Sequence, residues 1–229
     1  MPGGCPAPAL RRSLRGVWGA GDTVSSRTSA ASRERRTVFV AWGDESGSVS
    51  AVDPGVYLMG AVLAAPETTE HLREAMRELL RPSEKKVHWY GASESHRDRI
   101  IDVVADLTLE AVVVARLGEL GERDERRRRK CFETFAPTLA SMGCTHLTLE
   151  SRGPRDDARD RKMLEALRAQ RRVDSTLRLD HVPGPADPVL WIADAVCGAV
   201  VADRVGQSRW LTQIERRTSV YVIDDRPRR

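Results

Sequence analysis

The chain has 229 residues, of which 41% are hydrophobic and 31% are charged. This length and composition are typical of one folded domain with enough apolar residues to build a core. The longest stretch that is almost free of charge, residues 188–202, is too short to span a bilayer and holds Asp194 at its centre, which excludes a membrane-spanning protein. The four cysteines are far apart and form no CxxC pair, which favours a reducing cytoplasm over a disulfide scaffold or a zinc site.

The positive charge is concentrated at the start of the sequence. Lysine and arginine exceed aspartate and glutamate by 37 to 33, a formal charge of +4. Residues 1–36 hold seven arginines and two acidic residues, a net +5, which leaves −1 for residues 37–229. Because this leader is rich in Gly, Ala, Ser and Arg and lacks hydrophobic periodicity, we expect it to be disordered. Its composition also resembles organelle transit peptides, and a basic arm that binds nucleic acid is a further interpretation.

The folded part begins with a predicted hairpin. Residues 37–42 form a β-branched and aromatic run typical of a buried strand, and residues 56–64 form a second strand after a turn-rich segment. A helix is predicted to start at Pro66, to carry apolar residues at helical spacing and to stop at Pro82. A second helix is predicted from near Ser93, because isoleucine, valine and leucine recur after it with the same spacing.

Strands then alternate with helices along the rest of the chain. Strand patterns cover residues 111–117, 145–150 and 176–182, and helical patterns cover residues 122–142, 156–172 and 187–205. The remainder after residue 205, a polar loop followed by residues 220–223, is ambiguous between a loop and a last edge strand. This order predicts a single α/β domain over residues 37–224, with a mixed sheet of about five strands flanked by helices. Residues 225–229 form a basic C-terminal tail.

Three acidic residues stand out by their position in these elements. Asp44 and Glu150 each follow a predicted strand and precede a loop, which is where ligands bind in open α/β sheets. Asp194 is the only charge between residues 188 and 202, and a carboxylate in such an apolar helix needs a cation or several hydrogen-bond donors. Taken singly, each has a structural interpretation, as a cap of a turn or helix for Asp44 and Glu150 and as a buried ion pair for Asp194.

Brought to one sheet edge, the three carboxylates would repel one another unless a divalent cation neutralised them. Ligation by oxygen atoms alone suits Mg²⁺ or Mn²⁺. Two such ions would activate a water and stabilise the leaving oxygen in phosphodiester hydrolysis. The sequence therefore favours a metal-dependent phosphodiesterase site.

Cationic side chains lie near these acids in the sequence. Lys86 and His88 are two residues apart in a KKVHW segment between two predicted helices; Lys86 would hold a phosphate and His88 would transfer a proton. The alternative is a solvated loop that Trp89 and Tyr90 anchor to the core. Arg152 and Arg155 follow Glu150 and would guide a phosphate backbone to it.

Other signals are weaker or absent. The RRRRK run at residues 126–130 encircles its helix, which is typical of a solvated surface paired with neighbouring acids. The sequence has no Gly-rich phosphate loop, no GxSxG elbow and no HExxH motif, which disfavours nucleotide kinases, serine hydrolases and zinc proteases.

Three motifs together resemble a known family. The sequence reads GDESG at residues 43–47, KVHW at residues 86–89 and LWIADAVCGA at residues 190–199. This pattern is similar to the domain of unknown function 3800 family, whose members typically read DESG near the start and QxAD followed by hydrophobic residues and Gly near the end. The match covers about residues 38–206, and Trp191 stands where glutamine is common.

The resemblance implies a ribonuclease H-like fold with two metal ions. By this resemblance Asp44, Glu150 and Asp194 take the ligand positions, with Glu45 and Asp160 as additions. A metal-dependent nuclease acting on nucleic acid is then the first hypothesis, and water is its nucleophile. The alternative hypothesis is a noncatalytic module of the same fold that binds nucleic acid or a protein and in which Asp194 is structural.

Overall fold

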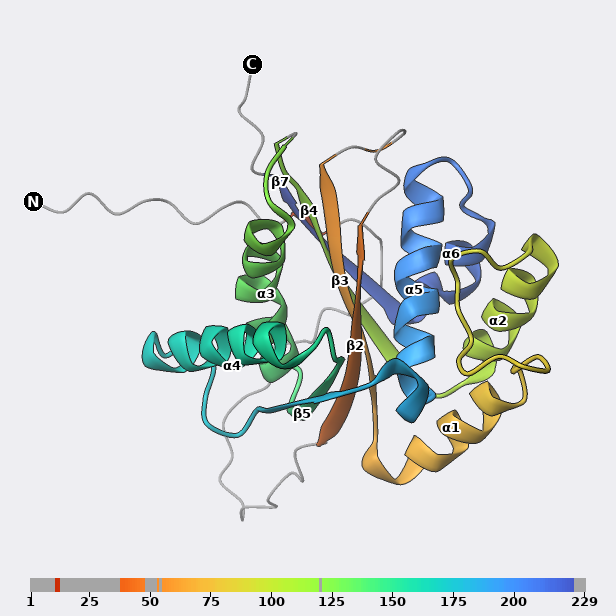
Figure 1. Ribbon diagram of the computed structural model, residues 1–229, viewed down its shortest axis with the longest axis horizontal. Helices are drawn as coiled ribbons and strands as arrows, with labels where there is room; N and C mark the ends of the chain where they lie inside the picture. The colour runs from red at the N-terminus through yellow and green to blue at the C-terminus, as the bar shows by residue number, and fades with distance from the viewer. Residues whose placement is uncertain (1–10, 13–37, 48–52, 54, 120, 225–229) are drawn as a thin grey trace, which may run out of the picture.

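The computed structural model describes residues 11–12, 38–47, 53, 55–119 and 121–224. The strands are β1 (Arg11–Arg12), β2 (Phe39–Gly47), β3 (Val56–Ala64), β4 (Glu110–Leu117), β5 (Cys144–Glu150), β6 (Arg178–Val182) and β7 (Thr218–Asp224). The helices are α1 (Thr69–Arg77), α2 (Glu94–Asp106), α3 (Asp124–Ser141), α4 (Pro154–Ala169), α5 (Val189–Arg204) and α6 (Arg209–Ile214), with short 3-10 turns at Pro66–Thr68, Gly184–Ala186 and Glu215–Arg217. The predicted α/β class, a mixed sheet flanked by helices, is confirmed (Figure 1).

The strands form one sheet in the order β1-β7-β4-β3-β2-β5-β6. β2 pairs antiparallel with β3, and β3 pairs antiparallel with β4, which confirms the predicted hairpin. β5 runs parallel to β2, and β6 runs parallel to β5. The sheet is therefore mixed: β2, β3 and β4 pair antiparallel in turn, and β5 and β6 extend it in parallel beyond β2.

Two hydrophobic cores lie on the two faces of this sheet. Side chains alternate along a strand, so β3 sends Leu58 and Val62 to one face and Met59 and Leu63 to the other. Helices α1, α2, α5 and α6 cover the first face, and α3 and α4 cover the second (Figure 1). Because both faces are covered, every residue of β3 is buried and the strand reads as a continuous apolar run.

Two parts of the structure differ from the prediction. β2 continues to Gly47, so Asp44 lies inside the strand and not after its end. The ambiguous segment near the C-terminus forms α6 and then β7, which pairs in parallel with β4. The helical pattern of α6 is only six residues long, and its apolar residues Trp210, Leu211 and Ile214 are buried by packing that the sequence does not display.

Some expectations concern residues that the structure does not describe. The predicted disordered leader, residues 1–36, lies outside the described residues except for Arg11–Arg12, which pair with β7 as β1. The tail at residues 225–229 lies outside them as well. In the described part of the chain, no helix has both the length and the apolar character needed to cross a membrane.

Candidate functional site

The pairing of β2 with β5 brings two of the three acidic residues together. Gly43 and Leu149 are the last pair of this parallel ladder, so Asp44 and Glu150 are the next residues on the two strands. Since side chains alternate, Asp44 leaves the sheet on the same face as Trp42, the face that α5 covers. Asp194 approaches from α5, and all three carboxylates line one pocket of about 360 Å³. The structure thus brings together the acids that the sequence singled out.

Asp44 has the most perturbed environment in this pocket. Burial, and then repulsion from Asp194 and Glu150, raises the pKa of Asp44 from 3.8 to about 8, against the opposing charges of Lys86 and His88. Such a carboxyl group keeps a proton at neutral pH until a cation arrives. A perturbed acid of this kind, in a pocket with several charged groups, is typical of a functional site.

Glu150 is held between a lysine and a glycine. The Lys86 ammonium donates to both carboxylate oxygens of Glu150, at 2.8 and 2.9 Å. On the other side the carboxylate lies against Gly184, where any Cβ would collide with its oxygens. The lysine that the sequence assigned to a phosphate is therefore an ion-pair partner of a predicted metal ligand in this structure.

Asp194 is held by the segment that contains His88. The Trp89 amide donates to Asp194 Oδ2 at 3.0 Å, and His88 Nδ1 lies 3.2 Å from the same oxygen. The hydrogen bond with Asp194 raises the pKa of His88. One turn further along α5, a Cβ on Gly198 would collide with the indole of Trp89. Since residues four apart share a helix face, Asp194 and Gly198 together form the docking surface for Trp89.

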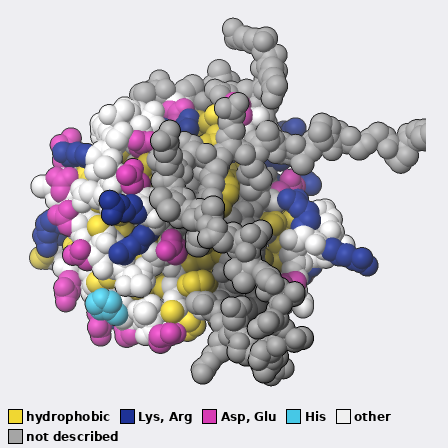
Figure 2. Space-filling view, turned by 180° about the vertical axis from the view of Figure 1, so that it is seen from behind, with side chains coloured by type: hydrophobic (Ala, Val, Ile, Leu, Met, Phe, Trp, Pro, Cys, Tyr) yellow, Lys and Arg dark blue, Asp and Glu magenta, His cyan; other side chains and the backbone are white. Residues whose placement is uncertain are grey.

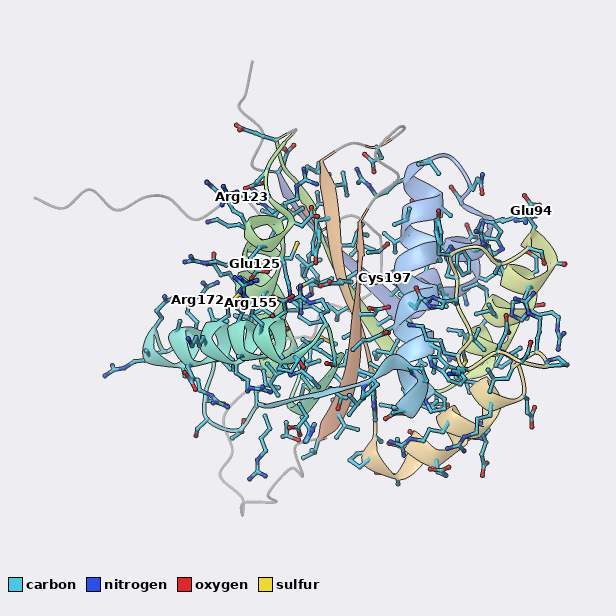
Figure 3. All side chains as sticks on the ribbon, in the orientation of Figure 1. Glu94, Arg123, Glu125, Arg155, Arg172 and Cys197 are labelled. Atoms are coloured by element: carbon cyan, nitrogen blue, oxygen red, sulfur yellow. The ribbon has the colours of Figure 1, made fainter. Side chains whose placement is uncertain are left out.

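Close packing of α5 on the sheet sets the distance between the acids. Cys197 lies on α5 where the helix faces the sheet (Figure 3), and its Sγ occupies the space that a Cβ of Gly60 would need. The same sulfur is 3.9 Å from the backbone oxygen of Asp44. The absence of a side chain at Gly60 therefore lets α5 approach β2 and β3 closely enough for Asp194 to enter the pocket.

A second cluster lies on the opposite face of β2. Arg128 donates from Nε and Nη2 to the two oxygens of Asp160, at 3.0 and 2.6 Å, and also contacts Glu45. His181 Nε2 lies 3.1 Å from Asp160 Oδ2. Burial opposes ionisation of Asp160, but the hydrogen bonds with His181 and Arg128 outweigh it and lower the pKa to about 2. Glu45 and Asp160, the added metal ligands of the resemblance, are thus paired with an arginine; Glu45 lines the pocket and Asp160 does not.

The predicted phosphate-binding arginines separate in the structure. Arg152 lines the pocket, with its Nε 3.4 Å from Glu45 and its Nη2 3.5 Å from Asp160. Arg155 is exposed on α4, which covers the opposite face of the sheet from α5, and is not part of the pocket (Figure 3).

Arg128 is a pocket residue that the sequence interpretation missed. The run at residues 126–130 is predicted to be a solvated surface, but Arg128 is 2% exposed and lines the pocket. Its position relative to Phe132 and Phe135, four and seven residues later, places it on the buried stripe of α3. This spacing could have indicated that Arg128 is buried, but the arginines on either side of it are typical of a solvated helix.

Trp89 and Tyr90 also differ from the prediction that both anchor the loop. Trp89 is buried, whereas Tyr90 is 89% exposed and lines the pocket. Tyr90 lies in a turn that the hydrogen bond from the Ala92 amide to the Trp89 carbonyl, at 3.2 Å, closes, and its side chain faces solvent. Only the tryptophan therefore attaches this segment to the core.

The carboxylates do not surround a common point in this structure. Among the described residues, no group of three or more His, Cys, Asp or Glu side chains is arranged to hold a metal ion. Lys86 instead forms an ion pair with Glu150, and His88 lies within hydrogen-bond distance of Asp194. The donor chemistry still fits a hard divalent cation, because all three acids offer oxygen and Asp44 lacks a cationic hydrogen-bond partner among the described contacts.

The sequence matches no protein-family model and no curated protein. Membership of the family named above therefore stays a prediction.

The solved structures that are similar to this chain include the following three. The PCNA:RNase HII complex from Archaeoglobus fulgidus shares 12% identity over 78% of this chain and 77% of that chain, with a TM-score of 0.46. Ribonuclease H2 from Pyrococcus horikoshii shares 17% identity over 78% and 76%, with a TM-score of 0.42. A mutant of Bst-RNase HIII shares 12% identity over 83% and 60%, with a TM-score of 0.38. At these identities and TM-scores, the likeness says nothing about what this chain binds or does.

Proposed function

We propose that this chain is a divalent-metal-dependent phosphodiester hydrolase acting on nucleic acid, built on a ribonuclease H-like domain. The observation that carries the proposal is the convergence of Asp44, Glu150 and Asp194 on one pocket, with the pKa of Asp44 raised to about 8. A buried acid in repulsion with two others gains most from a cation. The resemblance of the sequence motifs to the 3800 family supports the same proposal.

The three carboxylates would hold Mg²⁺ or Mn²⁺. When bound, the metal supplies an activated water and stabilises the charge of the leaving oxygen. The donor oxygens come from two adjacent strands and one helix, which keeps them on rigid elements. Lys86 and His88 would compete with a metal held there for the carboxylate oxygens of Glu150 and Asp194, and the loss of those oxygens would free both cations for the substrate.

The cations of the pocket then act on the substrate. Lys86 holds a phosphate oxygen, as a point charge on a flexible stem. Arg152, at the start of the loop after β5, orients the same backbone and remains anchored to Glu45. His88 has a half-exposed ring beside the acids and transfers a proton to or from the reacting groups. These roles make phosphodiester cleavage the reaction that the residues support best.

A cleavage assay with labelled RNA and DNA, each single-stranded and duplex, tests the proposal. We expect hydrolysis in Mn²⁺ or Mg²⁺ and none in EDTA. Asp44→Asn and Asp194→Asn should each lower the rate at least about 100-fold, since even residues that only support metal ligands cost 10- to 100-fold. The matched control is Asp102→Asn, an exposed position on α2, which should leave the rate unchanged.

One observation favours a second candidate function. Glu150 is already paired with Lys86, and Asp194 already has His88 and the Trp89 amide as partners, as in a structural network that needs no metal. A noncatalytic module of the same fold would bind nucleic acid or a protein without metal. Absence of cleavage in every metal, together with oligonucleotide binding that EDTA does not change, would replace the first proposal by this one.

A further inference from the structure

Tyr90 presents an aromatic ring to solvent beside the pocket. It is 89% exposed, and the next most exposed large hydrophobic side chain in the described part of the chain is Val38, at 45%. A buried tyrosine ring would remove a large apolar area from water, so this ring forgoes that stabilisation. Single exposed apolar residues are common in proteins, and exposure alone therefore assigns no role. A role is indicated by the position of Tyr90 beside the pocket and by the ordered backbone that carries it.

The backbone that carries Tyr90 is held firmly. The preceding residue, Trp89, packs edge-on against Trp210, with ring centroids 5.1 Å apart, and the Arg97 guanidinium lies 5.2 Å from its centroid. The Trp89 amide donates to Asp194, and the Trp89 carbonyl accepts from Arg97 at 3.3 Å. The ring of Tyr90 is therefore displayed from an ordered support, which keeps the entropy cost of binding on it low.

The side chains around Tyr90 include cations that can bind the phosphate of a nucleotide. The same pocket is lined by Lys86, His88 and Arg152, the cations to which we assign phosphate binding and proton transfer. Its volume of about 360 Å³ is within the range of small-ligand sites. Asp44, Glu45, Glu150 and Asp194 line the same pocket, so its cations are local phosphate contacts within a mixed-charge lining. Proteins bind single strands by combining cations with an exposed aromatic ring, because the cations contact the backbone and a base stacks on the ring.

We propose that Tyr90 is a stacking platform for an unpaired base, so that the site takes single-stranded nucleic acid or an unpaired nucleotide next to the scissile phosphate. A base inside a duplex is stacked on both faces and offers none to a tyrosine, which makes Tyr90 a specificity-determining residue. The inference rests on the proposed function for the place of the phosphate, but it concerns binding and is measured without cleavage.

Fluorescence anisotropy with the full chain tests this inference. The probes are end-labelled RNA and DNA oligonucleotides, each as a single strand and as a blunt duplex, titrated in EDTA and again in Ca²⁺. Tyr90→Ala should weaken single-strand binding about tenfold, the effect of removing one stacked base, and leave duplex binding unchanged. Tyr90→Phe and Tyr90→Trp should stay within about twofold of the wild type because they keep the ring. Val38→Ala is the matched control for loss of exposed apolar area.

Each outcome decides the inference. Equal binding by the wild type and Tyr90→Ala overturns it, as does an equal loss on duplexes, a loss in Tyr90→Phe, or a wild type that prefers duplexes. A difference between the RNA and DNA strands identifies the preferred sugar. If no cleavage is found but Tyr90→Ala still weakens single-strand binding, the inference about Tyr90 is retained and the chain is a noncatalytic binding module. If cleavage succeeds only on duplexes, the proposed function stands and the stacking site does not.

Discussion

Asp44 couples the charge of the pocket to the stability of the protein. In the folded chain its pKa is raised from 3.8 to about 8, first by burial and then by Asp194 and Glu150. Between these two values the folded state binds more protons at this residue than the unfolded state does. The free energy of unfolding therefore falls as the pH rises from about 4 to about 8 and receives no further contribution from Asp44 above that range.

Replacing Asp44 by asparagine should remove this pH dependence. At 1.36 kcal/mol per pKa unit, we expect the metal-free variant to gain on the order of 2–5 kcal/mol over the wild type between pH 5 and pH 9. Thermal or urea unfolding of both proteins in EDTA measures the difference. The Asp102→Asn control should follow the wild type at every pH. A difference between Asp44→Asn and wild type that stays constant over this range contradicts the electrostatic description of the site.

At the scale of elements, the segment between α1 and α2 depends on one helix. Residues 86–90 supply Lys86 and His88 to the pocket, and Trp89 attaches them to α5 through Asp194 and Gly198. The spacing of an aspartate and a glycine four residues apart in α5 is thus explained by docking of this segment. The motif at residues 190–199 therefore positions the segment at residues 86–90 and also supplies a carboxylate to the site.

Gly198→Ala should loosen this segment without unfolding the sheet. A methyl group at Gly198 collides with the Trp89 indole, so we expect a loss of about 1–3 kcal/mol of stability, as in other overpacked cores. Hydrogen exchange of residues 86–92 should become faster, while that of β3 and β4 stays slow. The matched control is Gly47→Ala, because nothing lies within 4 Å of a Cβ there. Unchanged exchange of residues 86–92 would show that Gly198 does not set the position of Trp89.

At the scale of the whole molecule, net charge does not mark a nucleic-acid surface. On the face seen in Figure 2, Lys and Arg side chains lie among Asp and Glu side chains over the described part of the surface. Residues 37–229 carry a formal −1, whereas residues 1–36 carry +5. Attraction of a phosphate backbone must therefore come from the local cations of the pocket or from the leader.

Removing charge from the leader should separate these two sources. In a variant in which glutamine replaces Arg27, Arg33, Arg35 and Arg36, we expect weaker oligonucleotide binding at low salt. The log–log slope of the salt dependence should become shallower by about 0.7 for each phosphate that the variant no longer neutralises. Cleavage at saturating substrate and the single-strand preference should stay unchanged, because both belong to the pocket. Anisotropy titrations at several salt concentrations measure the slope; a slope equal to that of the wild type assigns all phosphate binding to the folded part.

How much of the candidate site could be predicted depended on whether its signals were local. Asp194 was detectable because it is the single charge in an apolar run, and Glu150 because it closes a predicted strand. Asp44 was detectable because the predicted strand stopped just before it, although β2 continues to Gly47. Arg128 was hidden by the arginines around it, and its burial follows from contacts with Glu45 and Asp160, which are distant in the sequence. The exposure of Tyr90 could not be predicted either, because Trp89 and Tyr90 are both aromatic and only the packing shows that Trp89 alone is buried.

The sequence by itself determined the α/β class, most of the elements and the three acids, because backbone preference and hydrophobic periodicity are local properties. The tertiary structure decided which side chains meet. The parallel pairing of β2 with β5 placed Asp44 beside Glu150, and alternation along β2 sent Asp44 toward α5 and Glu45 toward Arg128. Strand order and helix packing join residues far apart in the chain, and no local pattern records such contacts.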